Sequence, residues 1–286
     1  MDSCRIACVR YLNTAPLVEG LEHVQGLTLI PTVPSRIVDL LASGEADVGL
    51  ASIVDAVAAP VPLTVLQAGM IGCDGPTLTV RVFSSVPFED VSVLHADTDS
   101  HTSVVLARLV LHQHFGRRVE VVPFDARERV TPGAPVDARP LDEAWPPTVL
   151  LIGDKVATDP PPANRYPFQL DLGEAWKAWT GLPFVYAAWM CRSDEAESPT
   201  VRTAAALLDR QRRHNATRLG WVAAMHAPSA RWPVDRADRY LGGLLRFDLD
   251  QAARRGATRF IAEAASRGLL PERTIAWCEP YAAVEG

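Results

Sequence analysis

Small polar side chains follow the apolar runs of this sequence at several points. Asn13 and Thr14 come after the run Ile6–Val9, and Ser52 comes after Ala46–Ala51. An amide or hydroxyl at such a position can hold a small molecule by hydrogen bonds, because open α/β sheets bind ligands at the carboxyl ends of their strands. Asn and Thr are also favoured helix N-caps, so a purely structural role for them stays open on these residues alone.

The densest polar stretch of the chain, Asp97–Ser103, precedes an apolar helical pattern. Unpaired N–H groups at a helix start, with hydroxyls beside them, can bind an anion without a formal positive charge. We therefore expect the hydroxyls of this stretch to contact a ligand. They belong to Thr98, Ser100, Thr102 and Ser103. Simple capping by Asp97 or Asp99 is the alternative, and His101 is either a candidate base near neutral pH or a solvated side chain.

One carboxylate stands out as a further candidate. Asp154 follows the apolar run Val149–Ile152 and is expected to face the same cleft from the end of a strand. A carboxylate at that position could contact the ligand or remove a proton from it. Glu174 opens a predicted helix, where an acidic side chain is favoured by the helix dipole, so we do not pair it with Asp154 as a second catalytic acid.

Motifs of several other chemistries are absent from the sequence. The glycine-rich stretch Gly69–Pro76 has neither the spacing of a P-loop nor that of GxGxxG. No GxSxG, HExxH or DxDxDG occurs. The five cysteines are scattered, include no CxxC, and are expected to be free thiols. They are Cys4, Cys8, Cys73, Cys191 and Cys278. We predict no metal and no cofactor.

The order of apolar runs and helical patterns predicts the architecture. Residues 5–58 alternate three strands with three helices, which is typical of a parallel sheet covered on both faces. The pattern restarts at Val91, and extended segments near residues 76–92 and 183–192 connect the parts. We predict an α/β fold of two lobes with a central cleft and two hinge crossovers. The parts are lobe one, residues 1–88 plus 190–286 with a helical C-terminus, and lobe two, residues 89–189.

Composition and charge exclude some classes of binding partner. The 286 residues carry a net charge of −6 and 48% hydrophobic residues, and no basic tract marks a nucleic-acid surface. No apolar run is long enough to span a membrane, and the N-terminus lacks the pattern of a signal peptide. We therefore expect a cytoplasmic protein, monomeric or homodimeric, that binds a small molecule and neither nucleic acid nor membrane.

Several of these stretches together resemble a known family. The segments at residues 9–17 (VRYLNTAPL), 34–50 and 171–184, with Asp97–Ser103 and Leu151–Asp154, resemble the chorismate dehydratases of the futalosine route to menaquinone. The sister family, which makes 1,4-dihydroxy-6-naphthoate, typically opens on a Ser-Pro-Cys-Pro-Asn-Asp-like turn and relies on a cleft histidine. The Tyr-Leu-Asn-Thr-Ala-Pro opening here favours the dehydratases.

The resemblance implies a fold and a reaction. The fold would be that of type 2 periplasmic binding proteins, and the activity that of a carbon–oxygen hydro-lyase. Chorismate, a dianion, would be converted to 3-[(1-carboxyvinyl)oxy]benzoate and water. A base would remove the hydrogen at the ether carbon while the neighbouring hydroxyl departs, and aromatisation would drive the elimination.

The resemblance also implies roles for individual residues. Asn13 matches the family's site asparagine and, as a neutral amide, would orient the leaving hydroxyl or a carboxylate. Ser84 and Thr79 are candidate hydroxyl donors, and we place Ser84 with Asn13 in the catalytic set. The base would be the enolpyruvyl carboxylate of the substrate or Asp154. The alternatives that stay open are the sister synthase, a non-catalytic binding protein for small anions, and a ligand-sensing regulator.

Overall fold

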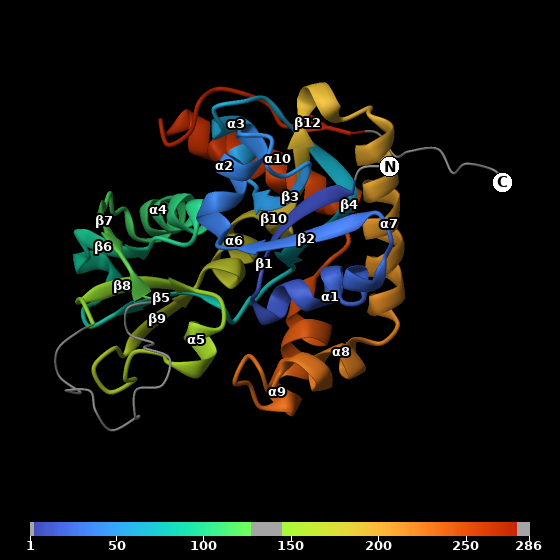
Figure 1. Ribbon diagram of the computed structural model, residues 1–286. Helices are drawn as coiled ribbons and strands as arrows, with labels where there is room; N and C mark the ends of the chain where they lie inside the picture. The colour runs from blue at the N-terminus through green and yellow to red at the C-terminus, as the bar shows by residue number, and fades with distance from the viewer. Residues whose placement is uncertain (1–2, 127–144, 279–286) are drawn as a thin grey trace.

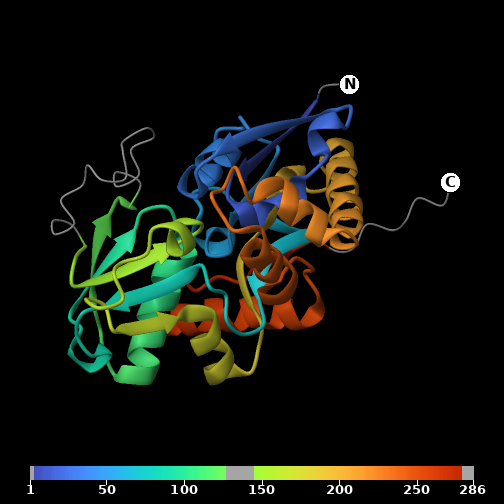
Figure 2. The same cartoon turned by 90° about the horizontal axis from the view of Figure 1, so that it is seen from below.

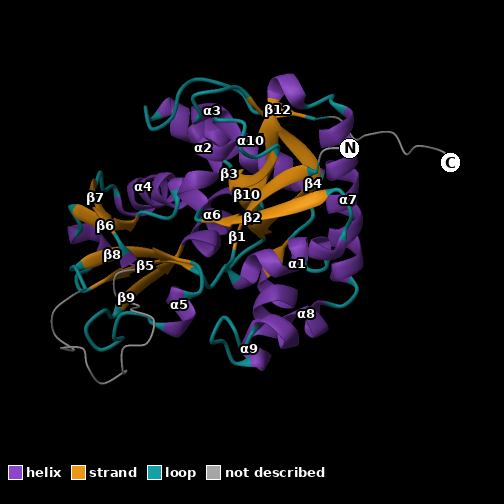
Figure 3. Cartoon of the chain, in the orientation of Figure 1, coloured by secondary structure: helices purple, strands orange, loops and turns teal. Residues whose placement is uncertain are grey.

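Two β-sheets, each flanked by helices, make up the protein (Figures 1 and 3). This computed structural model describes residues 3–126 and 145–278. The larger sheet has seven strands in the order β11-β4-β10-β3-β1-β2, with β12 beside β4. Its strands are β1 (Cys4–Val9), β2 (Leu27–Thr32), β3 (Val48–Ser52), β4 (Leu63–Cys73), β10 (Phe184–Arg192), β11 (Leu245–Arg246) and β12 (Ala276–Trp277).

The smaller sheet has five strands in the order β7-β6-β8-β5-β9. Its central strands are parallel, since β6 pairs in parallel with β7 and β8, whereas β5 is antiparallel to β8 and β9. The carboxyl ends of β6 and β8 therefore meet at one edge of the sheet, which is where open α/β sheets bind ligands. The strands are β5 (Val80–Ser84), β6 (Val93–Asp97), β7 (Glu120–Phe124), β8 (Thr148–Ile152) and β9 (Phe168–Asp171).

Helices cover both sheets. Those that follow strands of the first half are short, and the long ones lie in the smaller half and at the C-terminus (Figure 1). Polar caps fix several starts: Ser100, Asp171, Ser198 and Asp250 each accept a backbone N–H of the first turn. The α-helices are α1 (Ala15–Val18), α2 (Ile37–Ala42), α3 (Asp55–Ala58), α4 (His101–Phe115), α5 (Lys155–Thr158), α6 (Leu172–Thr180), α7 (Pro199–Ala216), α8 (Leu219–His226), α9 (Val234–Arg239) and α10 (Gln251–Ser266).

An aromatic cluster joins the two halves where the chain returns to the larger sheet. The rings of Trp176 on α6, Phe184 on β10 and Phe260 on α10 meet edge to face, with centroids 4.9–6.0 Å apart. All three side chains are fully buried. The tryptophan-rich segment near the second crossover is therefore part of the core, where such contacts add to simple area burial.

The α/β architecture predicted from the sequence is confirmed, including the strand–helix alternation of residues 5–58. Two details differ. Gly69–Cys73, expected as a loop, continues strand β4. Gly72 allows the backbone of Phe184 on the neighbouring strand to come close, since a Cβ at Gly72 would lie 2.5 Å from the Phe184 carbonyl oxygen. The sheets also change over between Cys73 and Val80 and between Asp171 and Phe184, not at the predicted lobe boundaries after residues 88 and 189.

Candidate active site

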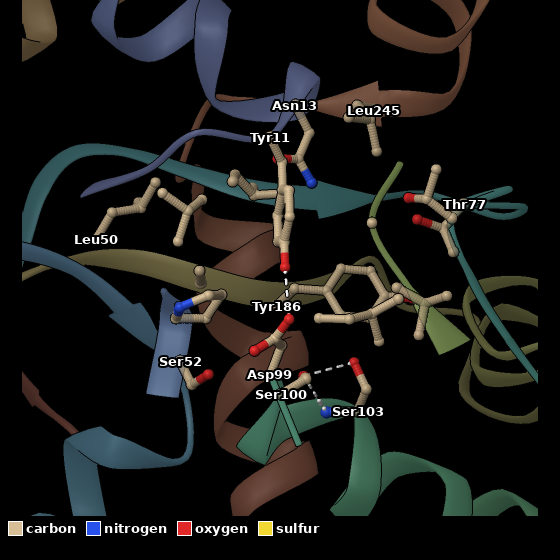
Figure 4. A pocket seen from close by; sticks show the side chains of 18 of the residues that line it. Tyr11, Asn13, Leu50, Ser52, Thr77, Asp99, Ser100, Ser103, Tyr186 and Leu245 are labelled. Carbon is tan, nitrogen blue, oxygen red and sulfur yellow. Dashed lines mark hydrogen bonds between the residues drawn. The ribbon is translucent and has the colours of Figure 1, made fainter. Parts of the chain in front are cut away.

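A pocket of about 600 Å³, counting space open to solvent, lies between the two sheets. We call it the central pocket (Figure 4). It is lined from the larger half by residues of β1, β3 and β10, and from the smaller half by residues that follow β6 and β8. Its polar lining residues are Tyr11, Asn13, Ser52, Thr77, Thr79, Asp99, Ser100, Ser103, Tyr186 and Tyr240. Five residues predicted for the site are among them: Asn13, Ser52, Thr79, Ser100 and Ser103.

Asn13 enters the pocket from the turn that follows strand β1. This turn is a 3-10 helix, Leu12–Thr14, which leads directly into α1. Thr14 is buried and does not line the pocket, but its hydroxyl donates to Oδ1 of Asn13 at 3.4 Å. The phenol of Tyr240 also lies beside Asn13. Thr14 therefore positions the amide, which corrects its expected role as a direct ligand contact.

Tyr11 connects the opening turn to the smaller half. Its hydroxyl donates to Oδ2 of Asp99 at 2.9 Å, and Nζ of Lys155 lies 3.3 Å from the same oxygen (Figure 4). Burial, and then the negative charge of Asp99, raise the pKa of Tyr11, so the phenol keeps its proton. The ring lies against Gly153 (φ +71°), where a Cβ would come within 3.3 Å of it. Neither Tyr11 nor the role of Asp99 is evident from the sequence, because the two residues are brought together only by the fold.

The N-terminus of α4 forms the opposite wall. Ser100 is the N-cap, and its hydroxyl accepts the Ser103 N–H at 3.1 Å while donating to the Ser103 hydroxyl at 2.9 Å. The predicted alternative, capping by Asp97 or Asp99, is wrong. The helix presents its N-terminal partial positive charge to the pocket, with Ser52 from β3 contributing a hydroxyl. This wall suits a carboxylate.

The hinge supplies the predicted hydroxyl of Thr79 together with those of Thr77 and Tyr240, which the sequence did not mark as ligands. The carboxylate of Asp171 accepts the backbone N–H groups of Thr77 and Leu78 and so fixes the first crossover. Thr79 and Tyr240 share a hydrogen bond of 2.6 Å between their hydroxyls. Tyr240 lies in a π-helical segment, Tyr240–Leu244, that brings a C-terminal residue to the pocket. No local pattern links residue 240 to residue 79, so this contact follows from tertiary structure alone.

Ser84 lies away from the central pocket. It ends strand β5 opposite Thr148, whereas Val80 at the other end of the strand lines the pocket. The Ser84 side chain is fully buried, donates to the Val86 carbonyl at 2.7 Å and contacts the Thr148 hydroxyl at 3.0 Å. We therefore correct its expected catalytic role to a structural one. The strand direction, which the sequence pattern does not give, decides this.

Asp154 connects the two halves but does not line the pocket. One carboxylate oxygen accepts the Leu12 N–H at 3.1 Å, and the other accepts Nε1–H of Trp232 at 3.1 Å. Burial raises the pKa of Asp154 to about 6 despite these hydrogen bonds and the nearby Lys155. One oxygen thus holds the turn that carries Asn13 and the other holds Trp232, which corrects the expectation of a direct substrate contact.

The remaining predicted residues of the polar stretch lie outside the pocket lining. Thr98 is exposed and Thr102 is buried in the first turn of α4. His101 points to the larger half, where Nδ1 lies 2.9 Å from Oδ1 of Asp55. The hydrogen bond to Asp55 raises the pKa of His101, although partial burial opposes it. His101 is therefore a link between the halves rather than a base in the pocket.

The charge of the pocket is low. Asp99 is the one charged residue among the lining residues of the described chain, and no arginine, lysine or histidine lines the pocket there. Within residues 3–126 and 145–278, no group of three metal-ligating side chains could hold an ion. In the same ranges, no helix has the length and apolar character to cross a bilayer.

Solved structures similar to this chain place its fold among periplasmic-binding-protein-like folds. A protein of Archaeoglobus fulgidus matches with a TM-score of 0.67 and 14% identity, covering 94% of this chain and 98% of that one. The alkanesulfonate-binding protein SsuA from Xanthomonas axonopodis pv. citri, bound to MOPS, matches with a TM-score of 0.60 and 12% identity, covering 96% of both chains. These similarities confirm the two-lobe fold expected from the resemblance.

Sequence comparison gives the family. A chorismate dehydratase of Thermus thermophilus is 29% identical over 233 residues, which are 76% of this chain and 79% of that protein. Residues 4–266 match the profile of a family described as menaquinone biosynthesis. That match runs from the first strand to the end of α10 and includes every residue that lines the central pocket. The chain belongs to this menaquinone biosynthesis family.

Proposed function

We propose that the protein is a chorismate dehydratase that converts chorismate to 3-[(1-carboxyvinyl)oxy]benzoate and water. The observation that carries the proposal is Asn13, whose amide lines a pocket without histidine in the described chain. The amide is held by Thr14 and lies beside Tyr240, so it can orient an oxygen of the substrate but cannot take up a proton at neutral pH.

The two walls of the pocket suit a ligand with two separated carboxylates. The N-terminus of α4, with Ser100 and Ser103, and the facing Ser52 would bind one carboxylate. On the hinge side, the hydroxyls of Thr77 and Thr79 would bind the other. The pKa of Tyr186 is raised well above its ordinary value by burial, so its phenol is a hydrogen-bond donor at neutral pH.

The elimination needs a base, and the protein offers few. Asp154 is engaged by Leu12 and Trp232 outside the pocket, and Asp99 accepts hydrogen bonds from Tyr11 and Lys155. We therefore assign the base to the enolpyruvyl carboxylate of the substrate. It would take the proton from the ether carbon, and the electron pair would form the ring double bond. The neighbouring hydroxyl would leave as water with the proton that the carboxylate removed. Asn13 would hold that hydroxyl in position.

The sister synthase is the second candidate and is disfavoured by the same pocket. That family relies on a cleft histidine, whereas the nearest candidate here, His101, is bonded to Asp55 outside the pocket lining. A non-catalytic binding protein would share the fold with the alkanesulfonate-binding relative. Only turnover separates it from an enzyme.

Incubation of the purified protein with chorismate tests the proposal. We expect the absorbance of an aromatic product to appear, with a mass one water below that of chorismate. Asn13→Ala is expected to abolish most of this turnover, and Ser84→Ala, whose residue lies away from the pocket, is the matched control. Tight binding of chorismate without an aromatic product would refute the enzyme assignment.

A further inference from the structure

Another hollow lies where the C-terminal half of α4 meets the end of α10, and we call it the basic pocket. It has a volume of about 520 Å³, counting space open to solvent. Its lining residues are Arg108, His112, Arg118, Val119, Arg267 and Leu269. Three guanidiniums and an imidazole thus gather in one hollow of a protein whose net charge is −6. None of its lining residues in the described chain is acidic.

Three elements build the basic pocket. Arg108 and His112 lie four residues apart on α4 and so share a helix face. Gly116, in the left-handed conformation (φ 66°), ends α4 and turns the chain so that Arg118 follows it before β7. Arg267 comes from the C-terminus of α10, which lies against α4 (Figure 2). Both halves of the molecule therefore contribute cations to the same space.

The cations of this pocket differ in their pairing. Arg267 is held in place by Glu263 and by the ring of Trp179, 5.7 Å from its guanidinium carbon. Arg108 and Arg118 make no ion pair with any residue of the described chain. Nδ1 of His112 is buried and has no hydrogen-bond partner among the described residues. Arg108 and Arg118 are therefore the cations of this pocket that lack a counter-ion among the described residues.

We propose that the basic pocket binds a compact polyanion, the class that includes phosphorylated metabolites and polycarboxylates. Guanidinium groups match the oxygens of phosphate and carboxylate by paired hydrogen bonds, and two of the three arginines, Arg108 and Arg118, have no counter-ion in the described chain. The anion would be held by Arg108 and Arg118 from the smaller half and by Arg267 from the larger half. The bound anion would thus link the two halves, at a site separate from the central pocket.

Titration calorimetry with inorganic pyrophosphate at constant ionic strength tests the proposal on the 286-residue chain. We expect saturable binding, weakened at least about tenfold by Arg108→Gln and by Arg118→Gln separately, because each change removes charged hydrogen bonds. Arg255→Gln, an exposed arginine of α10 outside the pocket, is the matched control and should bind as the unmodified protein does. Circular dichroism melting curves confirm that each variant is folded.

A second titration and the control variant define which results would overturn the proposal. Citrate in place of pyrophosphate distinguishes a polycarboxylate from a phosphate-bearing ligand, and binding of either supports the site. Absence of saturable binding by both anions refutes it, as does equal binding by the control and both pocket variants. None of these readouts requires turnover of chorismate, so their outcome is independent of the proposed dehydratase activity.

Discussion

The two ends of helix α4 lie at two different hollows between the same two halves. The N-terminal end brings Ser100 and Ser103 to the central pocket, and the C-terminal half brings Arg108 and His112 to the basic pocket. The first pocket has no cationic side chain among its described lining residues, whereas the second has three arginines. Both are nevertheless suited to anions.

The helix dipole explains why the two ends differ. Unpaired N–H groups give a helix N-terminus a partial positive charge, so hydroxyls and an amide suffice beside it. The C-terminus carries the opposite partial charge and repels an anion, so arginines must supply the attraction there. A pocket without arginines also leaves the substrate's own carboxylate less tightly ion-paired. That is the condition under which it can act as a base.

The largest effect is expected at Asn13. If the neutral central pocket performs the elimination, Asn13→Ala should lower kcat for chorismate by about 10²–10³-fold, the usual cost of losing one hydrogen-bonding group that acts in the transition state. Thr98→Ala removes an exposed hydroxyl outside the pocket lining and should leave kcat within about twofold. Steady-state kinetics of the two variants measure the difference. Comparable losses in both would show that the pocket is not the catalytic site.

Asn13 also shows how far the sequence could predict this site. A polar residue after the first strand, at a helix start, indicates a ligand position by local rules, and the structure places it in the pocket. Ser52 and Ser100 were predicted as ligand contacts from similar local patterns, and both line the pocket, whereas the N-cap role of Ser100 was not predicted. The same rule gave a wrong role for Ser84. A strand has two ends, and only the strand pairing shows which end meets the pocket.

The contacts that the sequence missed share a different property. Tyr11 meets Asp99 across 88 positions and Thr79 meets Tyr240 across 161 positions, so no window of local pattern contains either pair. The basic pocket was missed for the same reason, since Arg118 and Arg267 come from opposite halves. The alternation of strands and helices, in contrast, is set by local apolar spacing and was predicted well.

The next effect concerns how the halves are held at the central pocket. The pKa of Asp154, about 6, is raised above its ordinary value, so the folded state favours the protonated form. This contribution to stability is fully present below pH 4 and is lost as the pH rises through 6, on the order of 3 kcal/mol. Asp154→Asn removes the titration. The Tm of the variant relative to the unmodified protein should therefore rise between pH 4 and 7.

The exposed Asp235 on α9 supplies the control for this titration. Asp235→Asn should show a constant Tm difference from the unmodified protein over the same pH range. A constant difference for Asp154→Asn as well would show that burial does not raise the pKa of this carboxyl group as the structure indicates. The chemistry of the pocket is not involved in either measurement.

A smaller effect separates capping from ligand binding at the N-terminus of α4. Ser100→Ala and Ser198→Ala remove caps of the same type, from α4 and α7 respectively, and each should cost about 1 kcal/mol of stability. Only Ser100→Ala should also raise KM for chorismate, by about threefold to tenfold, because the helix end loses its order next to the substrate. An equal KM change in both variants would assign the effect to stability alone.

The smallest effect is expected at the first residue of α4. The hydrogen bond to Asp55 raises the pKa of His101, so the pair stabilises the fold below the ordinary histidine pKa and loses that contribution as the pH rises through the raised value. The His101 side chain is 41% exposed, so the contribution should be below about 1 kcal/mol. His101→Gln should therefore lower Tm at pH 6 by more than at pH 8. His114→Gln, in the exposed last turn of the same helix, is the matched control, and an identical pH dependence in both variants would contradict a link specific to the N-terminal end.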